Sequence, residues 1–507
     1  MNDAIVLRAN GGAAIGLGHV VRAASLIPLL PAGRPVIFVV NREVVDFATR
    51  LATPLGCTAV RSVEYEEYAD GELGELRDVY LGARLAVVDG YAFTSNYLRR
   101  LGDLAGAVLY VDDLANRPLP VDLVVNHAPG FSVDDYSLGF GTILRTGPAN
   151  ALLRPAFAAQ STSLQEGAAI PNQREGLFIC MGGADINNLT ADYVDLVRDL
   201  GYKGRIAVVL GASSTAAIRR ATHSASGDVE TFVDLPGDEL ARLMVTCRRA
   251  IVPSSGILLE CLATGLEVAT GFYVDNQERV FRGYADLGCV YPLGDLNDIK
   301  AARMKLASFF LNGGGRLERS PLSLGIANSS RRLKRDLGYL TEDFAIRPAV
   351  FDDADLLFAW RADPETVLNS RSGDIPQMDA HRVWLRAVLA DPQRRLTIVA
   401  YRGRPIAQMR IDVEADRRAS VTISLEAASR GKGLSAHVYQ RALRDSLPWL
   451  RARDVRSITA LVRAGNEPSV RLHESVGFAT VHQGGGFVTM ATAVPVETTV
   501  LSTANRR

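Results

Sequence analysis

Short apolar runs alternate with helical patterns through the first third of the chain. Runs of the length of buried strands lie at residues 4–9, 34–40, 85–89 and 107–112. Between them apolar residues recur at helical spacing, for example at 97–104. Because strands that alternate with helices form parallel sheets covered on both faces, we predict a Rossmann-like, doubly wound α/β domain over residues 1–160.

The second third of the chain repeats this order. Strand-like runs lie at 176–181, 204–210, 229–232 and 250–253, and helical patterns lie at 188–200, 239–248 and 256–264. We predict a second Rossmann-like domain over residues 161–340, which begins with a polar linker at about 160–175. Two such domains in tandem favour a ligand site at the carboxyl ends of their strands.

The pattern changes in the last third, after the glycine run at 312–315 and a basic helix at 329–337. Helical patterns at 353–361 and 381–389 come first. Strand-like runs at 396–401, 406–411 and 420–425, a helix at 434–447 and a strand at 457–462 follow. This order predicts a mixed α+β domain over residues 344–495, and the polar tail beyond Val494 is predicted to be mobile.

Composition narrows the class of protein. The chain has 507 residues, 48% of them hydrophobic, and its 56 basic residues balance 56 acidic ones. A net charge of zero disfavours nucleic acid as a partner. No apolar run is long enough for a membrane span and no secretory signal is visible. The five cysteines form no CxxC pair, which predicts reduced thiols, no metal site and a cytoplasmic protein.

One motif of the first domain carries candidate chemistry. Gly16 and Gly18 allow a tight turn after the first strand, and His19 then stands at the start of a helix that continues through Arg22. A neutral imidazole that faces a ligand site can act as a general base for water. A capping or core histidine fits the same pattern, so both interpretations stay open.

Two glycine turns of the second domain predict an anion site. Gly182 and Gly183 follow a strand and precede a helix, and Ser254, Ser255 and Gly256 repeat this arrangement. Amides at the amino end of a helix lack partners within the helix and attract phosphate.

Two further positions of the second domain are candidates for nucleotide or sugar contacts. Glu260 lies one turn into the helix that follows Gly256, where its carboxylate can accept ribose hydroxyls, although a solvated helix residue is equally ordinary. Asn276 and Gln277 lie in a loop that can reach a sugar or phosphates, or that forms a plain turn.

The third domain has a loop with a comparable pattern. Arg430 begins a stretch that leads from a strand into a helix, and the stretch continues with Gly431, Lys432, Gly433, Leu434 and Ser435. Amides and a fixed positive charge at a helix start suit a pyrophosphate, while a surface turn rich in Gly and Lys is the alternative. A second pattern joins Asn466, Ser469 and His473 to Gly477 and Phe478.

With these motifs in place, residues 1–340 resemble the UDP-sugar hydrolases of pseudaminic acid biosynthesis, whose fold is similar to that of GT-B glycosyltransferases. The matching segments are 8–22, Val-Val-Asp-Gly-Tyr at 87–91, Val-Asp-Asp-Leu-Ala-Asn-Arg at 111–117, 147–155, 181–190, 254–265 and 275–277. The resemblance implies that water cleaves UDP from an anomeric carbon without a metal. It implies His19 as the catalytic histidine and Tyr91 as an active-site tyrosine.

The same resemblance implies a UDP site. We assign UDP binding to Gly18, Arg22, Gly182, Gly183, Ser254, Ser255, Gly256, Glu260, Asn276 and Gln277. Two departures from the family pattern stand out. Asn10 replaces an aspartate that can orient the histidine or the water, and Asp185-Ile186 replaces Asp-Pro.

Residues 344–490 resemble the GNAT acyltransferases, which implies acetyl-CoA as co-substrate, with its pyrophosphate on residues 430–435 and a further contact from Asn466. Ser435 replaces the usual Gly or Ala of this family. His473 stands where many members have the tyrosine that protonates the departing thiolate. Glu426 is our candidate base for the substrate amine, and a solvated carboxylate fits it as well.

The two resemblances together predict a bifunctional enzyme that N-acetylates a UDP-amino-sugar and then hydrolyses the UDP-sugar. Its predicted partners are UDP-sugar and acetyl-CoA, with no metal, no nucleic acid and no membrane, and the sequence leaves the oligomeric state open. One alternative is a GT-B glycosyltransferase with an acetyltransferase domain. The other is a nucleotide-sugar-binding protein with degenerate sites, suggested by Asn10, Ser435 and His473.

Overall fold

A computed structural model describes most of the chain. The described residues are 3–12, 15–64, 71–167, 174–183, 185, 187–211, 228–311, 317–371 and 373–495. Most of the predicted linker at 160–175 falls within them, but 168–173 do not. The glycine run at 312–315 and all of the tail beyond residue 495 also lie outside the described residues.

Contacts divide the chain into two compact units. The first consists of Met1–Ala115, Val125–Ser132 and Arg145–Gly338, and the second of Asn116–Val124, Val133–Leu144 and Tyr339–Arg507. The first unit therefore includes most of both predicted Rossmann-like domains. The second includes the predicted α+β domain and two short segments from the first third of the chain.

The first sheet has the strand order β3-β2-β1-β4-β5-β7-β9. Its strands are β1 (Ile5–Ala9), β2 (Val36–Asn41), β3 (Ala59–Val63), β4 (Leu85–Asp89), β5 (Val108–Val111), β7 (Leu123–Asn126) and β9 (Ile143–Thr146). All pairs from β3 to β5 are parallel. Because β1 and β4 are buried along their whole length, their residues are apolar except for Arg8 in β1 and Asp89 at the end of β4. The chain builds outward from β1 in one direction and from β4 in the other, so the topological switch lies between these two strands.

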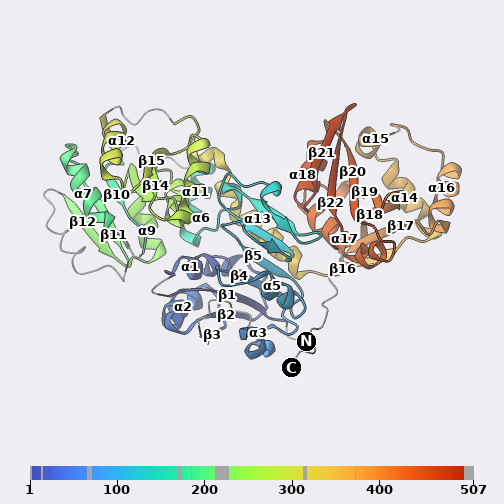
Figure 1. The fold of residues 1–507 in the computed structure, drawn as a ribbon, viewed down its shortest axis with the longest axis horizontal. Helices are drawn as coiled ribbons and strands as arrows, with labels where there is room; N and C mark the ends of the chain where they lie inside the picture. Colours follow the sequence, from blue (N-terminus) through green and yellow to red (C-terminus); the bar gives the residue numbers. More distant parts are fainter. Residues whose placement is uncertain are drawn as a thin grey trace, which may run out of the picture. The chain divides into compact units, whose positions relative to one another are not determined.

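Helices α1 (Gly18–Ala24), α2 (Val45–Ala52), α3 (Glu72–Glu75), α4 (Arg77–Tyr80) and α5 (Ser95–Gly102) connect these strands. Figure 1 shows α1 and α5 beside the sheet that contains β1 and β4. The predicted helix at 97–104 corresponds to α5, whose amino end is capped by the Thr94 side chain.

The second sheet, β12-β11-β10-β13-β14-β15, is parallel throughout. Its strands are β10 (Leu177–Ile179), β11 (Ile206–Leu210), β12 (Val229–Val233), β13 (Arg249–Pro253), β14 (Glu267–Phe272) and β15 (Tyr291–Asp295). Its helices are α6 (Pro155–Gln165), α7 (Leu189–Asp199), α9 (Gly237–Met244), α10 (Gly256–Ala263), α11 (Asp275–Asp286), α12 (Ile299–Leu311) and α13 (Ser329–Thr341). Apolar clusters cover both faces of this sheet, and the doubly wound α/β prediction is confirmed for both sheets.

The third sheet is mixed, as predicted for an α+β domain, with the order β16-β17-β18-β19-β20-β22-β21. Its strands are β16 (Phe344–Pro348), β17 (Arg394–Tyr401), β18 (Arg404–Val413), β19 (Arg418–Leu425), β20 (Ser457–Arg463), β21 (Ala479–Gly484) and β22 (Phe487–Ala493). Its helices are α14 (Ala354–Arg361), α15 (Pro364–Asn369), α16 (Met378–Ala390), α17 (Ser435–Arg451) and α18 (Glu467–Glu474).

The parallel strands β19 and β20 pair only at their beginnings. Their register runs from Arg418 opposite Ser457 to Ser420 opposite Thr459, although both strands continue beyond these pairs. The loop from β19 to α17, residues 426–434, therefore starts where the two strands are no longer paired.

The two early segments of the second unit lie against α17. β6 (Pro118–Leu119) pairs with β8 (Ser137–Leu138). Arg444 of α17 forms an ion pair with Asp122 and donates to the carbonyl of Val121 at 2.7 Å. These contacts join sequence positions more than 300 residues apart, and no periodic pattern in the sequence predicts them.

All five cysteines are buried and unpaired, which confirms the prediction of free thiols.

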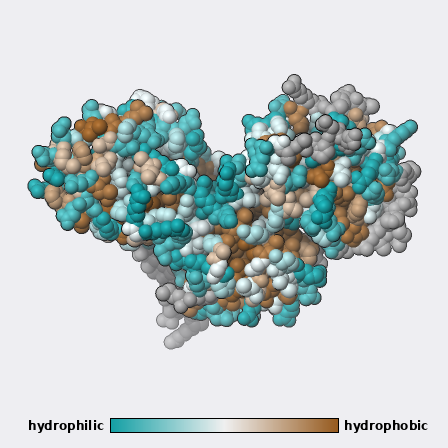
Figure 2. All heavy atoms as spheres, turned by 180° about the vertical axis from the view of Figure 1, so that it is seen from behind, coloured by the Kyte–Doolittle hydropathy of each residue, from teal (hydrophilic) through white to brown (hydrophobic). Residues whose placement is uncertain are grey.

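Within the described part of the chain, no helix combines the length and the apolar character that crossing a bilayer requires. Hydrophilic and hydrophobic residues are interspersed over the face of the molecule that Figure 2 shows.

Candidate functional site

His19 lies at the topological switch of the first sheet. The loop after β1 closes with an isolated bridge between Gly12 and Gly16, and Gly16 has a φ of +82°, which favours glycine. α1 begins at Gly18, so His19 is the second residue of the helix, and it is 7% exposed. The carboxyl end of the neighbouring strand β4 carries Asp89.

The hydrogen bond between His19 and Asp89 defines the tautomer of the imidazole. The Nδ1 atom lies 2.8 Å from Asp89 Oδ1. A carboxylate oxygen only accepts, so Nδ1 bears the hydrogen, and in the neutral form of the ring Nε2 has the lone pair. The arrangement is that of a histidine oriented by an acidic partner to act as a general base.

Arg22, one turn further along α1, holds two carboxylates at once. Its Nε and Nη2 atoms donate to Asp89 at 2.7 and 2.6 Å. Its Nη1 and Nη2 atoms donate to Asp113 at 2.6 and 3.0 Å. Both edges of the guanidinium plane are thus engaged, which is the bidentate geometry that favours arginine over lysine.

This cluster fixes the charges around His19. Burial alone would raise the pKa of Asp89, but Arg22 and His19 together hold it below its usual value. Arg22 likewise holds the pKa of Asp113 well below its usual range against the effect of burial. Burial and the Arg22 charge lower the pKa of a second histidine, His127, to about 4. Both carboxylates are therefore ionised and His127 is neutral at pH 7.

Tyr91 and Asn276 complete the site. The Tyr91 ring meets the His19 ring edge-on, with centroids 4.7 Å apart, and its hydroxyl donates to Asp113 Oδ2 at 3.1 Å. Asn276 lies in the first turn of α11 and not in a loop, so that part of the prediction for Asn276 and Gln277 is wrong. It donates through Nδ2 to the Tyr91 hydroxyl at 3.2 Å. Burial of the hydroxyl and the Asp113 carboxylate raise the pKa of Tyr91. The structure thus brings together His19, Arg22, Tyr91 and Asn276, which the sequence proposed separately.

Asn10, the departure noted in the sequence, directly follows β1, and its amide donates to the carbonyl of Asp89 at 3.1 Å. Its Nδ2 atom donates to Asn41 at 3.4 Å, and its Oδ1 atom is buried without a hydrogen-bond partner. Because Asp89 supplies the carboxylate that orients His19, an aspartate at position 10 is not needed for that task.

The glycine turn after β10 is built differently from the predicted anion site. Gly182 has a φ of +92°, as a tight turn requires. However, the amides of Leu189 and Thr190 at the start of α7 donate to the carboxylate of Asp185 at 2.8 and 3.1 Å. An internal carboxylate therefore occupies the helix start, and the prediction for Gly182 and Gly183 rests on the turn alone.

The second turn leads into α10. The Ser255 amide donates to the carbonyl of Pro253 at 2.8 Å, and the Ser254 hydroxyl lies 3.0 Å from that of Thr270. Gly256 is the first residue of the helix, where amides have no acceptor within the helix. The backbone amide of Ser255, one of the predicted phosphate donors, therefore already donates to a carbonyl of the protein.

Glu260 and Gln277 both have partners within the protein. The Glu260 carboxylate accepts from Arg154 Nε and Nη2, both at 2.7 Å, and is 6% exposed. A carboxylate has about four acceptor positions, so this pair leaves two for other donors. Gln277 Oε1 accepts from the Tyr273 amide at 3.3 Å. Their assignment to UDP stays a prediction.

The loop before α17 has the backbone of an anion site. Gly431 and Gly433 have positive φ angles of 72° and 74°, Leu434 is buried, and Ser435 begins the helix. The carbonyl of Lys432 accepts a hydrogen bond from the Tyr339 hydroxyl at 2.9 Å. The loop therefore turns sharply into the amino end of a long helix, as the sequence predicts.

The Arg430 side chain does not extend toward this helix end. Its Nη1 atom donates to Asp363 and Glu365 at 2.7 and 2.9 Å, and Nη2 donates to Thr366 at 2.8 Å. Nε and Nη2 also reach the carbonyl of Leu425. The guanidinium thus fastens the loop to the start of α15, and its charge is balanced by two carboxylates. The predicted phosphate contact of Arg430 has no geometric support in this arrangement.

The other predicted residues of this domain also have internal partners. Glu426 pairs with Arg404 and accepts from the Ser429 hydroxyl at 3.2 Å. Asn466 caps α18 by accepting from the Ser469 amide at 3.2 Å. His473, which is 4% exposed, donates from Nδ1 to the Ser469 carbonyl at 2.8 Å. Burial lowers the pKa of His473, so the neutral ring dominates at pH 7 and is a poor proton donor.

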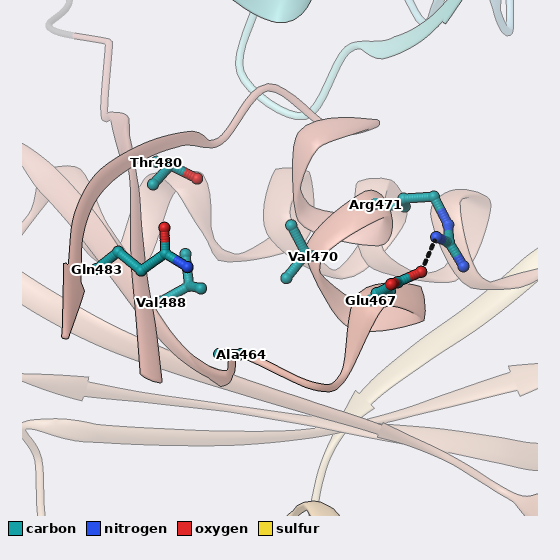
Figure 3. A pocket seen from close by; sticks show the side chains of 7 residues that line it. All are labelled: Ala464, Glu467, Val470, Arg471, Thr480, Gln483 and Val488. Atoms are coloured by element: carbon teal, nitrogen blue, oxygen red, sulfur yellow. Dashed lines mark hydrogen bonds and ion pairs between the residues drawn. The ribbon is translucent and has the colours of Figure 1, made fainter. Parts of the chain in front are cut away.

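A pocket of about 300 Å³ lies between α18 and the hairpin of β21 and β22. It is lined by Ala464, Glu467, Val470, Arg471, Thr480, Gln483 and Val488. Figure 3 shows Val470 facing the strands, and Glu467 paired with Arg471 on the helix, at 2.9 Å. None of the predicted acetyl-CoA residues lines this pocket.

Asp89, Asp113 and His127 are residues of this site that the sequence did not single out. Each lies at or just beyond the end of a strand of the first sheet: β4, β5 and β7. Polar residues at the carboxyl ends of adjacent parallel strands are the signal that identifies them.

Among the described residues, no group of three or more His, Cys, Asp or Glu side chains is arranged to hold a metal ion.

Residues 343–479 match the family model of the acetyltransferase (GNAT) domain. The C-terminal region is a GNAT domain. Its solved relatives include an acetyltransferase of the GNAT family from Streptococcus pneumoniae, 16% identical, covering 30% of this chain and 100% of that chain with a TM-score of 0.26. Spermidine N-acetyltransferase from Vibrio cholerae is 14% identical and covers 30% of this chain and 95% of that chain, with a TM-score of 0.26.

The region before the GNAT domain resembles a hydrolase. UDP-2,4-diacetamido-2,4,6-trideoxy-β-L-altropyranose hydrolase from Campylobacter jejuni is 22% identical over 292 residues, which cover 56% of this chain and 97% of that protein. The chain therefore combines a hydrolase-like region with a GNAT domain, and a GNAT domain implies acetyl-CoA as a co-substrate.

Proposed function

We propose that this chain is a bifunctional enzyme of nucleotide-sugar metabolism. Its GNAT domain transfers an acetyl group from acetyl-CoA to the amino group of a UDP-4-amino-4,6-dideoxy-sugar. Its hydrolase-like region then releases UDP from the resulting UDP-2,4-diacetamido-2,4,6-trideoxy-sugar, a step of pseudaminic acid biosynthesis. The likeness to the Campylobacter hydrolase supports the second substrate, and the GNAT domain supports the first reaction.

One observation is the main support for the proposed hydrolysis of the UDP-sugar. The Nδ1 hydrogen of His19 is donated to Asp89, which leaves the Nε2 lone pair to accept a proton. In the proposed reaction His19 takes a proton from water while the water oxygen bonds to the anomeric carbon. The bond from that carbon to the UDP oxygen breaks, and UDP leaves with the electron pair. The neighbouring Asp89 carboxylate stabilises the imidazolium that forms.

In the acetyl transfer the amine nitrogen bonds to the thioester carbonyl carbon and the bond from that carbon to sulfur breaks. The proton lost by the amine nitrogen balances the one that the sulfur gains, so CoA leaves as its thiol. The unpaired ends of β19 and β20, together with the glycine turn before α17, support the placement of acetyl-CoA at residues 430–435. We propose that backbone amides of this loop, rather than the Arg430 side chain, bind the pyrophosphate.

The test is a mass-spectrometric assay of the full chain with the UDP-amino-sugar and acetyl-CoA. Acetylated sugar nucleotide followed by free sugar and UDP is the expected result, and the absence of both products would refute the proposal. Release of UDP only after an acceptor is added would instead identify a glycosyltransferase. His19→Ala separates an enzyme from a binding protein, because only an enzyme loses turnover while UDP binding is retained.

A further inference from the structure

Arg22 and His19 both donate a hydrogen bond to the same carboxylate oxygen, Asp89 Oδ1. Arg22 Nη2 lies 2.6 Å from Asp89 Oδ1, and His19 Nδ1 lies 2.8 Å from that oxygen. The two nitrogens are themselves only 3.1 Å apart. Because Nδ1 bears a hydrogen, it cannot at the same time accept one from Arg22.

The two hydrogens of Nη2 explain why this close approach is tolerated. One is donated to Asp89 and the other to Asp113 Oδ2 at 3.0 Å. Nη1 also donates to Asp113, so this carboxylate holds the whole outer edge of the guanidinium. No hydrogen of Nη2 is left for the imidazole.

Asp113 is itself held in place from outside the histidine cluster. It accepts the Tyr91 hydroxyl, which accepts in turn from Asn276. The pair of Arg22 and Asp113 is largely buried, with 13% and 15% of the side chains exposed, so water competes weakly for these hydrogen bonds.

We propose that Asp113 is a positioning residue that sets the tautomer of His19 through Arg22. When Asp113 is present, Nη2 gives its second hydrogen to Asp113, and His19 keeps the Nδ1 hydrogen that it donates to Asp89. Without Asp113, the nearest alternative acceptor for that hydrogen is His19 Nδ1. Accepting it requires the tautomer with the hydrogen on Nε2, which has no lone pair there for a water proton. The effect of Asp113 on catalysis rests on the proposed hydrolysis, whereas its effect on the tautomer of His19 does not depend on that function.

The tautomer can be read without any substrate. Imidazole ¹⁵N correlation spectra of the full chain labelled at histidine distinguish the two tautomers, and the His19→Gln variant identifies the His19 signals. The wild-type protein is expected to have the Nδ1–H form of His19. Asp113→Ala and Asp113→Leu, which leave no acceptor at this position, are expected to shift His19 toward the Nε2–H form.

Two further variants keep the test decisive. Arg22→Met combined with Asp113→Ala removes the second donor near His19 Nδ1 and is expected to restore the Nδ1–H form. Asp336→Asn is the matched control, because Asp336 is a fully buried carboxylate of the same unit that pairs with Arg145 through two hydrogen bonds. It is expected to leave the His19 tautomer unchanged.

Kinetics supply the second readout. Asp113→Ala is expected to lower kcat for UDP release by about 10²-fold, within the range that a general base contributes, with the Kd for UDP changed less than twofold. An unchanged His19 tautomer in folded Asp113 variants, or an Nε2–H form in the wild type, would overturn the proposal. If the wild-type chain releases no UDP, the proposed function fails, while the spectra still decide the role of Asp113.

Discussion

The chain enters both α1 and α17 through a glycine turn, and near each turn an arginine pairs with two carboxylates, but the two arginines differ in position and in burial. Arg22 lies within α1, and its guanidinium spans two carboxylates beside His19. Arg430 lies before α17 and pairs with Asp363 and Glu365 near the start of α15. An arginine near a glycine turn is therefore not by itself an anion ligand. Its position relative to the start of the helix decides which groups its side chain contacts.

The largest expected effect distinguishes the two regions by their chemistry. His19→Gln removes the candidate general base, so UDP release should fall by about 10²–10⁴-fold. Acetyl transfer should be unchanged, because His19 belongs to the other compact unit. Chromatographic assays of UDP and of acetylated sugar measure both. The control is His482→Gln on the exposed strand β21, and an equal loss of UDP release in this control would contradict the assignment.

The next effect is on stability. Arg22→Met leaves Asp89 and Asp113 buried without a counter-charge, which should cost about 3–5 kcal/mol in denaturant unfolding. Arg430→Met should cost about 1 kcal/mol or less, because Glu365 is 64% exposed and water screens that pair. Equal losses for the two variants would remove the distinction between the two arginines.

The dependence of stability on pH tests the role of Arg22 further. In the wild type the lowered pKa of Asp89 and Asp113 contributes stability above their unfolded pKa of about 3.9, and this is lost as pH falls through the folded values. In Arg22→Met the unpaired carboxylates should instead be relieved by protonation. Its stability should therefore rise, relative to the wild type, as pH falls from 7 toward 4.

A third effect comes from His127. Its pKa of about 4 in the folded protein lies below the unfolded value of about 6.5. The unfolded chain therefore binds more protons between these values, and stability should decline by up to about 3 kcal/mol as pH falls from 6.5 to 4. His127→Phe should remove this part of the pH dependence in urea titrations. An unchanged slope would show that His127 is protonated in the folded protein.

The smallest expected effect concerns acetyl-CoA. Since Arg430 is engaged with α15 and the Leu425 carbonyl, Arg430→Met should raise the Kd for acetyl-CoA less than about tenfold, through a loosened loop. Gly433→Ala, at a φ of +74°, should have the larger effect because it strains the turn itself. Isothermal titration measures both. A hundredfold loss in Arg430→Met would mean that its side chain contacts the phosphates after all.

Much of the fold follows from local patterns. The mostly apolar runs of β1 and β4 predict buried parallel strands, and the change of pattern after residue 344 predicts the α+β domain. The positions of His19 and of the loop at 430–435 follow from glycines next to helix starts. What a local pattern does not contain is the partner of each side chain, such as Arg154 for Glu260.

The sequence by itself determined the strands and helices with the clearest apolar patterns, the two glycine loops and the candidate histidine, because these depend on residues close together along the chain. It did not predict β3, β14 or β15. Only the tertiary structure decided which charges meet. Asp89 and Asp113 reach Arg22 from positions 67 and 91 residues away because parallel strands bring their carboxyl ends to one edge of the sheet. The strength of these contacts depends on burial, which is a property of the folded whole rather than of any segment.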